Sequence, residues 1–165
     1  MNDFYEDLQY SYEVESFWDS FYKKAFVDLE RTELCNDLTL QRKGVDRFVY
    51  LKSGHVLTID EKSRRKAYPD IALEFLSNDK TGSPGWINKQ LVIDYLAYAF
   101  IPTGDVYLFP WEMLRRAWVE FGEIWKMTYG VIEAHNPDYN TLSVPVPIKV
   151  LRATVSTAAI IKIRP

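Results

Sequence analysis

The hydrophobic and polar residues of this chain recur with two different periods. Between residues 13 and 31, apolar side chains return every three or four positions, which is typical of an amphipathic helix. The same spacing over residues 111–128 predicts a second helix with a core-facing stripe of tryptophan and phenylalanine. Short segments rich in β-branched and aromatic residues, with partial alternation of apolar and polar positions, predict three strands over residues 45–51, 55–62 and 70–77.

The second half of the chain predicts further strands and an irregular region. Residues 78–86 are rich in turn formers and predict a loop. Residues 91–101 and 105–110 predict strands on either side of the turn PTGD, with a helix at the start of the first left open. The tail from residue 139 contains prolines and predicts a loop, a short helix and a final edge strand. We therefore expect one α/β domain over residues 1–165, with helices around a single mixed sheet of the α+β type.

The turn KSG between the first two strands determines which of their residues face one another. It suits a three-residue hairpin loop, because Gly54 can adopt the left-handed conformation that the third loop position requires. Leu51 then pairs with His55, and the numbers of paired residues add up to 106. A two-residue loop would shift the pairing by one residue, so the loop decides which side chains meet.

The three-residue loop gathers two carboxylates and one ammonium group on one face of the hairpin. Asp46 falls opposite Asp60, with Cβ atoms about 5 Å apart. Lys62 lies two residues beyond Asp60 and therefore on the same face, whereas Glu61 points to the other side. The rival two-residue loop would place Asp46 opposite Glu61 instead.

Two carboxylates this close repel each other unless a proton or a cation lies between them. Because the ligand atoms are oxygens, the pair favours Mg²⁺ or Mn²⁺ over zinc, with a backbone carbonyl of Ile59 or Glu61 as a further ligand. The nearby lysine ammonium could orient an attacking water or offset the charge on a phosphate in transit. Arg64, Arg65 and Lys66 follow directly and could bind flanking phosphates.

The net charge of −3 hides an uneven distribution along the sequence. Residues 1–40 carry three basic and ten acidic residues, a net −7, and residues 41–66 carry eight basic and three acidic, a net +5. Residues 67–165 carry nine basic and ten acidic, a net −1. The positive block coincides with the carboxylate pair. It suits a polyanion bound beside a metal, and a solvated basic surface is the alternative.

Other features of the composition argue against several classes of protein. No run approaches the roughly 20 apolar residues of a membrane span, and the N-terminal residues lack a signal-peptide pattern. The single cysteine, Cys35, excludes an internal disulfide framework and fits the reducing cytoplasm. With two histidines, a dedicated zinc site is not expected. We therefore expect a cytoplasmic protein without a membrane partner.

Asp46, followed by Asp60-Glu61-Lys62 on the next strand, resembles the signature of the PD-(D/E)xK, or restriction-endonuclease-like, nuclease superfamily. Val45 stands where the signature has proline. The wider stretch QRKGVDRFV…IDEKSRRKAYPDIALEFLS…GSPGWI is similar to phage- and bacteria-type members. The likeness covers residues 13–110.

This resemblance implies a fold, an activity and residue roles. The fold would be an αβββαβ core with flanking helices, and the activity a Mg²⁺-dependent hydrolysis of DNA phosphodiester bonds by an endonuclease. Asp46, Asp60 and Lys62 would be catalytic, and the two aspartates would bind the metal. Glu74 would add a carboxylate from the third strand, and Gln41 would support the site beside the nucleic acid.

Further residues are weaker candidates. Trp86 and Lys89 follow the glycine-containing loop and would stack on a base and contact a phosphate, although core packing of Trp86 is equally expected. Some superfamily members take an extra metal ligand from the first helix. The candidates for that ligand are Glu15, Glu30 and Glu33, and a solvated helix face is the alternative for each.

Three classes of function remain open at this level. The first is the metal-dependent nuclease, the second a nuclease-like module that binds nucleic acid without cutting, and the third a protein-interaction domain with an aromatic surface. The complete Asp/Asp/Lys set favours the first, because an inactive copy need not keep all three residues. A homodimer is also predicted, since two-fold symmetry matches the two antiparallel strands of a duplex.

Overall fold

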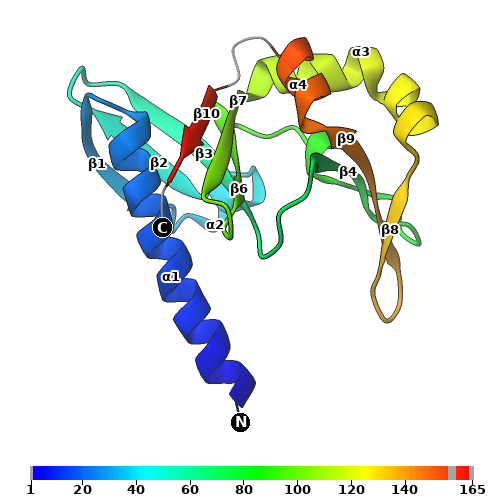
Figure 1. The fold of residues 1–165 in the computed structure, drawn as a ribbon, viewed down its shortest axis with the longest axis horizontal. Helices are drawn as coiled ribbons and strands as arrows, with labels where there is room; N and C mark the ends of the chain where they lie inside the picture. The colour runs from blue at the N-terminus through cyan, green and yellow to red at the C-terminus, as the bar shows by residue number, and fades with distance from the viewer. Residues whose placement is uncertain (1, 156–158, 164–165) are drawn as a thin grey trace.

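The computed structural model describes residues 2–155 and 159–163, with side chains from residue 10 onward. It shows a mixed α/β fold in which helices flank two sheets (Figure 1). The larger sheet has six strands in the order β1-β2-β3-β6-β7-β10 and combines antiparallel with parallel pairs. Its strands are β1 (Leu29–Leu34), β2 (Arg47–Leu51), β3 (Val56–Arg64), β6 (Tyr95–Phe100), β7 (Asp105–Pro110) and β10 (Ala159–Lys162).

Strands β2 and β3 form the predicted hairpin in the predicted register. Arg47 pairs with Ile59, so the numbers of paired residues add up to 106. The Leu51 N–H donates to the His55 carbonyl at 2.9 Å, which closes the three-residue loop. Gly54, in the third loop position, has a φ of +89°. The two-residue loop and its rival pairing are therefore excluded.

Strand β6 lies inside the larger sheet and separates two hydrophobic clusters. It runs parallel to β3 and antiparallel to β7. Leu96, Tyr98 and Phe100 contribute to one cluster, whereas Ala97 and Ala99 contribute to the other. This alternation is expected of a strand that is buried on both faces. The predicted strands around the turn PTGD are thus confirmed as β6 and β7.

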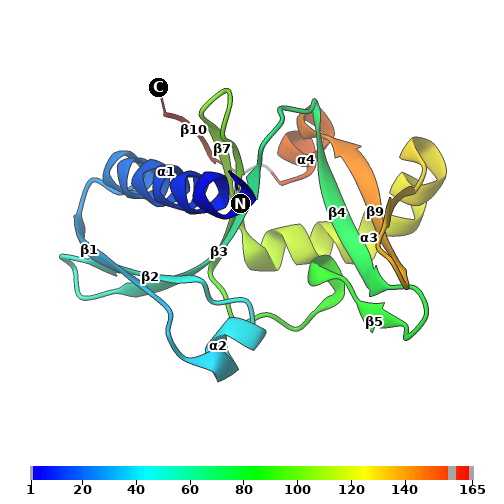
Figure 2. The same cartoon turned by 90° about the horizontal axis from the view of Figure 1, so that it is seen from below.

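Helix α1 (Asn2–Ala25) packs on one face of the larger sheet, and its N-terminal turns extend beyond the sheet (Figures 1 and 2). Its residues Trp18, Phe21 and Tyr22 are buried against strands of that sheet. The prediction that the helix runs to residue 31 is wrong. The chain leaves the helix after Ala25, and β1 pairs with β2, because sheet pairing there outweighs the helical spacing.

The second sheet has the strand order β5-β4-β9-β8. The predicted strand over residues 70–77 is present as β4 (Asp70–Asn78), but the expectation of a single sheet is wrong. To join the larger sheet, β4 would have had to pair with the edge of β3 that β6 occupies. It pairs instead with β9 (Asn140–Pro147) and β5 (Ser83–Pro84). Strand β8 (Ile132–His135) pairs with β9. Burial of Ile71 and Leu73 in the cluster that contains α3 fixes β4 in this second layer.

The second predicted helix is confirmed as α3 (Trp111–Tyr129), whose Trp118 stacks on Phe75 of β4. The shorter helical segments are α2 (Leu38–Arg42), the 3-10 turn η1 (Trp86–Asn88) and α4 (Ile148–Thr154). In the tail, α4 and the edge strand β10 agree with the prediction, whereas β8 and β9 were not predicted. Residues 156–158 and 164–165 of that tail lie outside the described residues.

No helix in the described ranges has both the length and the apolar character needed to cross a membrane.

Candidate functional site

Asp46, Asp60 and Lys62 lie together where strands β2 and β3 part. Lys62 Nζ donates to Asp60 Oδ1 at 2.5 Å. Asp46 lies close enough to Asp60 for its charge to raise the pKa of the Asp60 carboxyl. The Glu61 backbone N–H donates to Asp46 Oδ2 at 2.8 Å, which holds this carboxylate beside the end of the hairpin. The predicted convergence of two carboxylates and an ammonium group is confirmed.

Asp60 is a buried carboxyl group with a raised pKa. The exposed fraction of the residue is 2%. Burial raises the pKa of Asp60 from 3.8 to about 6, the ammonium group of Lys62 acts against this rise, and the charge of Asp46 adds to it. A cation between the carboxylates would replace their repulsion with attraction, so the site favours a positive ion over two bare carboxylates.

The other face of β3 carries a buried ionic cluster that the sequence analysis missed. Arg47 is 2% exposed, and its Nε donates to Glu61 Oε1 at 2.5 Å. Its Nη2 donates to both carboxylate oxygens of Glu15 in α1, at 2.8 and 2.9 Å. The Tyr22 hydroxyl, also in α1, donates to Glu61 Oε1 at 2.7 Å. These four residues form what we call the Arg47 cluster, which ties α1 to the strand that carries the candidate site.

The pKa shifts within the Arg47 cluster follow from burial and pairing. Burial raises the pKa of the Glu61 carboxyl, although Arg47 acts against the rise. Burial and the neighbouring Glu61 carboxylate raise the pKa of Tyr22. Burial alone would lower the pKa of Arg47, but its bonds to Glu61 and Glu15 raise it, so the guanidinium stays charged. The sequence signal for this cluster was a charged residue at a core-facing position of each strand of the hairpin, Arg47 in β2 and Glu61 in β3.

The candidate metal site consists of a carboxylate pair. Among the residues that the structure describes, no three aspartate, glutamate, histidine or cysteine side chains are arranged to hold one ion. Glu15 is bound to Arg47, so this glutamate of the first helix has a structural partner. Mg²⁺ commonly keeps several waters and takes one or two carboxylates together with substrate phosphates. The oxygen atoms of Asp46 and Asp60 therefore fit Mg²⁺, with the remaining positions left to water and substrate.

A cleft of about 390 Å³ lies between the two sheets, and Lys62 is one of the residues that line it. We call it the inter-sheet cleft. Its walls bring together four residues that the sequence analysis proposed for nucleic-acid or metal contact, in addition to Lys62. The residues that line it are Glu61, Lys62, Ser63 and Arg64 of β3, Ala72 and Glu74 of β4, Trp86 and Lys89 in and beside η1, Tyr98 of β6 and Ser143 of β9.

The predicted residues in the inter-sheet cleft differ in what they can offer a ligand. Arg64 Nε donates to the Tyr98 hydroxyl at 2.7 Å, which directs the guanidinium along the wall. Trp86 is 8% exposed and belongs to the core, so it presents little ring surface for stacking on a base. Glu74 lies on the second sheet and is not grouped with Asp46 and Asp60 in a three-carboxylate cluster.

The other three predicted residues lie outside the inter-sheet cleft. Gln41, in α2, donates from Nε2 to the Cys35 carbonyl at 2.6 Å and lines a second hollow of about 440 Å³ together with Asp46. It therefore braces the backbone beside the carboxylate pair. The guanidinium of Arg65 lies 4.0 Å from the centre of an aromatic ring of α1, and Lys66 is exposed.

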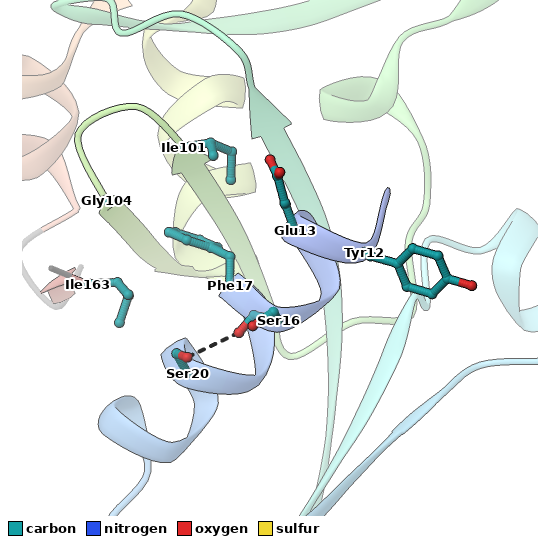
Figure 3. Close-up of a pocket in the computed structure, with 8 residues that line it drawn as sticks. All are labelled: Tyr12, Glu13, Ser16, Phe17, Ser20, Ile101, Gly104 and Ile163. Atoms are coloured by element: carbon teal, nitrogen blue, oxygen red, sulfur yellow. Dashed lines mark hydrogen bonds between the residues drawn. The ribbon is translucent and has the colours of Figure 1, made fainter. Parts of the chain in front are cut away.

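A larger, mostly apolar groove lies away from the carboxylate pair. Figure 3 shows it between α1 and the turn that joins β6 to β7. Its volume is about 570 Å³, and Phe17, Ile101 and Ile163 form its apolar surface. Among the described residues, its lining contains one carboxylate, that of Glu13, and no basic side chain. Its chemistry is therefore different from that of the site on the hairpin.

Comparison of the chain with family models, curated proteins and solved structures finds no match. The chemistry of the site thus follows from its own geometry. One face of β3 presents a carboxylate pair with a lysine, and the other face is anchored to α1 by the Arg47 cluster.

Proposed function

We propose that the protein is a metal-dependent nuclease that hydrolyses phosphodiester bonds of DNA, with Mg²⁺ or Mn²⁺ as its cofactor. The observation that carries the proposal is the end of the hairpin, where Asp46 precedes the last register pair, Arg47–Ile59, and lies near enough to Asp60 for their charges to interact, while Lys62 Nζ lies 2.5 Å from Asp60 Oδ1. An acidic pair beside an ammonium group suits phosphoryl chemistry, in which negative charge builds up next to a metal.

The topology around the hairpin supports a place in the PD-(D/E)xK superfamily. Helix α1 precedes the antiparallel strands β1, β2 and β3, and a crossover then leads to β6, which is parallel to β3. This order is similar to the αβββαβ core. The difference is that the crossover contains β4, β5 and η1 where the core has a helix.

In the proposed reaction the residues of the chain take different roles. Asp46 and Asp60 hold the metal, which when bound offsets negative charge on the phosphodiester under attack. The Lys62 ammonium has three N–H donors and gives one to Asp60, so the others are left to position the attacking water or a phosphate oxygen. Arg64 and Lys89, on the wall of the inter-sheet cleft, bind flanking phosphates.

Two substitutions on the same strand face test this assignment. Asp60→Ala removes a metal ligand, so Mg²⁺ affinity and DNA cleavage should both fall, and high Mn²⁺ should restore part of the cleavage. Lys62→Ala leaves both carboxylates, so metal affinity should persist while the cleavage rate falls about 10²–10³-fold, the usual loss of one such electrostatic contact. Extra metal should not rescue it. Calorimetry measures the affinity, and single-turnover cleavage measures the rate.

The matched control is Lys52→Ala, which removes an exposed lysine from the hairpin loop. It should cut DNA at the parent rate. The assignment is wrong if Lys62→Ala does the same, or if Asp46→Ala and Asp60→Ala both bind Mg²⁺ as well as the parent. DNA binding without any metal-dependent cleavage would instead identify a nuclease-like binding module.

A further inference from the structure

The inter-sheet cleft has a composition that the carboxylate pair does not explain. Three of its lining residues are cationic, Lys62, Arg64 and Lys89, and two are anionic, Glu61 and Glu74. The Glu61 carboxylate is paired with Arg47, which leaves Glu74 as the carboxylate of the lining that faces the three cations. The cleft is therefore positively charged beside a site whose own carboxylates are negative. Such a wall attracts an anionic ligand with more than one charge.

Two of these cations are available to a ligand. Within the described part of the chain, neither Arg64 nor Lys89 forms an ion pair, and Lys89 is exposed. Arg64 uses its Nε for the Tyr98 hydroxyl, which fixes the guanidinium, and its charge acts on the carboxyl of Asp70 without forming an ion pair with it. A fixed guanidinium is well suited to a phosphate, because its planar donors match phosphate oxygens.

The size of the cleft limits what can enter it. Its volume of about 390 Å³ is at the lower end of the range of pockets that enclose one small ligand. A unit of the size of one nucleotide fits this space. A base-paired duplex does not, because residues of β4 and β9 and residues of β3 and β6 together enclose a volume of the size of one small ligand.

The cleft also has a direction with respect to the carboxylate pair. Lys62 belongs both to its lining and to the bond with Asp60, so the cleft opens directly from the site. Lys89 also lines the cleft, from its position directly after η1. A second hollow, with Asp46 in its lining, adjoins the cleft along β3, since Glu61 and Ser63 line both. A flexible chain can pass the end of the hairpin from one hollow to the other.

We propose that the inter-sheet cleft binds one unpaired strand of nucleic acid, so that the preferred substrate is a single strand, a flap or a frayed end and not a continuous duplex. The part of this inference that concerns cleavage rests on the proposed nuclease function. The part that concerns binding does not, because it uses Arg64 and Lys89 and no metal ligand.

Binding in EDTA tests the inference separately from catalysis. The probes are a fluorescent single-stranded DNA oligonucleotide of about 12 nucleotides, an RNA of the same sequence, and a DNA hairpin whose bases are fully paired. Anisotropy titrations over a range of salt concentrations compare the parent with Lys89→Ala, Lys89→Glu and the control Lys52→Ala. Competition with a free mononucleotide shows whether the cleft holds a strand or a small molecule.

The expected result is that single strands bind more tightly than the hairpin. Lys89→Ala should weaken single-strand binding about 3–10-fold and reduce the salt slope by about 0.7, the value for one phosphate contact on a single strand. Lys89→Glu should weaken it further, and Lys52→Ala should change neither value. Comparable binding of RNA and DNA would assign recognition to the shared phosphate backbone.

Several results would overturn the inference. These are hairpin binding as tight as that of the single strand, equal effects of the Lys89 and Lys52 substitutions, full displacement by a mononucleotide at its single-site affinity, or no nucleic-acid binding at all. Cleavage assays judge the nuclease independently. Strand binding that depends on Lys89 but leads to no cleavage would refute the nuclease alone, whereas cleavage of duplex that ignores Lys89 would refute the cleft assignment alone.

Discussion

Asp60 and Arg47 are both 2% exposed, yet their charges are held in different ways. Arg47 has carboxylates of Glu61 and Glu15 as partners, and these hydrogen bonds satisfy a buried guanidinium. Asp60 has one lysine as partner and a second carboxylate beside it, so its charged form is under-compensated. The arrangement around Arg47 is structural. The arrangement around Asp60 leaves negative charge that a bound cation can neutralise.

The raised pKa of Asp60 predicts how stability depends on pH. Because the folded pKa of about 6 exceeds the ordinary 3.8, the folded state holds this proton more tightly, and stability falls as the pH rises through that window. The cost at neutral pH is roughly 3 kcal/mol at most. Asp60→Asn should therefore be more stable than the parent at pH 7.5, and this advantage should shrink at pH 4. Urea unfolding in EDTA measures the free energy of unfolding of both proteins at the two pH values. A stability difference that is the same at pH 7.5 and pH 4 would show that the raised pKa of Asp60 is not its cause.

Loss of Arg47 should be far more damaging than loss of an exposed arginine. Arg47→Ala leaves the Glu61 carboxylate buried without its main partner, which typically costs about 3–5 kcal/mol of stability. The control is Arg31→Ala, since the Arg31–Glu33 pair is about half exposed, and its removal should leave the free energy of unfolding nearly unchanged. Similar effects of the two substitutions would show that the Arg47 cluster does not anchor α1 to β3.

At the level of elements, β3 organises the site because each of its faces has a separate task. Even-numbered positions 60 and 62 carry the candidate chemistry, and odd positions 59 and 61 face α1. One edge pairs with β2, and the other pairs with β6. The strand is therefore fixed on three sides, which limits the movement of the carboxylate and the lysine relative to each other.

The edge strand β10 depends on a close approach at Gly104. The Ile163 N–H donates to the Gly104 carbonyl at 2.6 Å, and a Cβ on Gly104 would lie 1.7 Å from the Ile163 carbonyl oxygen. Gly104→Ala should therefore release β10 from β7, seen as faster hydrogen exchange in β10 and a lower free energy of unfolding. The control is Gly82→Ala, because Gly82 has a similar φ of +72° but open space around it.

The two alanine variants share the cost of a left-handed residue, about 1–2 kcal/mol. The difference between their free energies of unfolding thus reports the contact with Ile163 alone. Equal destabilisation, with β10 still protected from exchange, would mean that β10 contributes little to the sheet.

The hairpin register and the helix α3 could be predicted from sequence because their signals are local. Gly54 specified the loop, and a period of two then placed Asp46 opposite Asp60 without any knowledge of the rest of the fold. The stripe of Trp118 and Trp125 identified the buried face of α3 in the same way. The Arg47 cluster was not foreseen, since it depends on how α1 lies across the sheet.

Sheet membership could not be predicted, because it is decided by competition for strand edges. An apolar strand such as β4 is suited to either sheet, and the parallel pairing of β6 with β3 excludes it from the first. Strand β9 was missed because of Pro145 and Pro147, which usually indicate a loop. Both lie beyond Ser143, where the pairing of β8 with β9 ends. On that side of β9, no strand of the described ranges requires a backbone N–H from either proline.

At the scale of the whole molecule, the division into two sheets leaves a cleft between them, and part of α1 extends beyond the larger sheet (Figure 1). The inter-sheet cleft exists because β4 leaves the plane of β3, and α1 extends past the sheet that it covers (Figure 1). Tyr12 of α1 is 70% exposed at the rim of the apolar groove. An aromatic residue in such a place is more commonly found at an interface than alone in water.

A homodimer is the prediction at this scale. Light scattering across a range of protein concentrations should give twice the monomer mass, because two-fold symmetry lets two identical sites address two antiparallel strands. Tyr12→Ser should lower the dimer fraction if α1 takes part in the contact. A single monomer mass at every concentration, with and without DNA, would rule the dimer out.

The burial of α1 has a consequence for the synthesis of the protein on the ribosome. Trp18, Phe21 and Tyr22 share a buried cluster with Val106 and Leu108 of β7, which emerge roughly 80 residues later. At about 5–20 residues per second, this aromatic surface waits on the order of ten seconds for its partners. During that interval the nascent helix has only the partners from β2 and β3 in this cluster, so its hydrophobic stripe is incompletely covered. The newly made chain is therefore expected to depend on chaperones that shield such surfaces, more than its modest length would suggest.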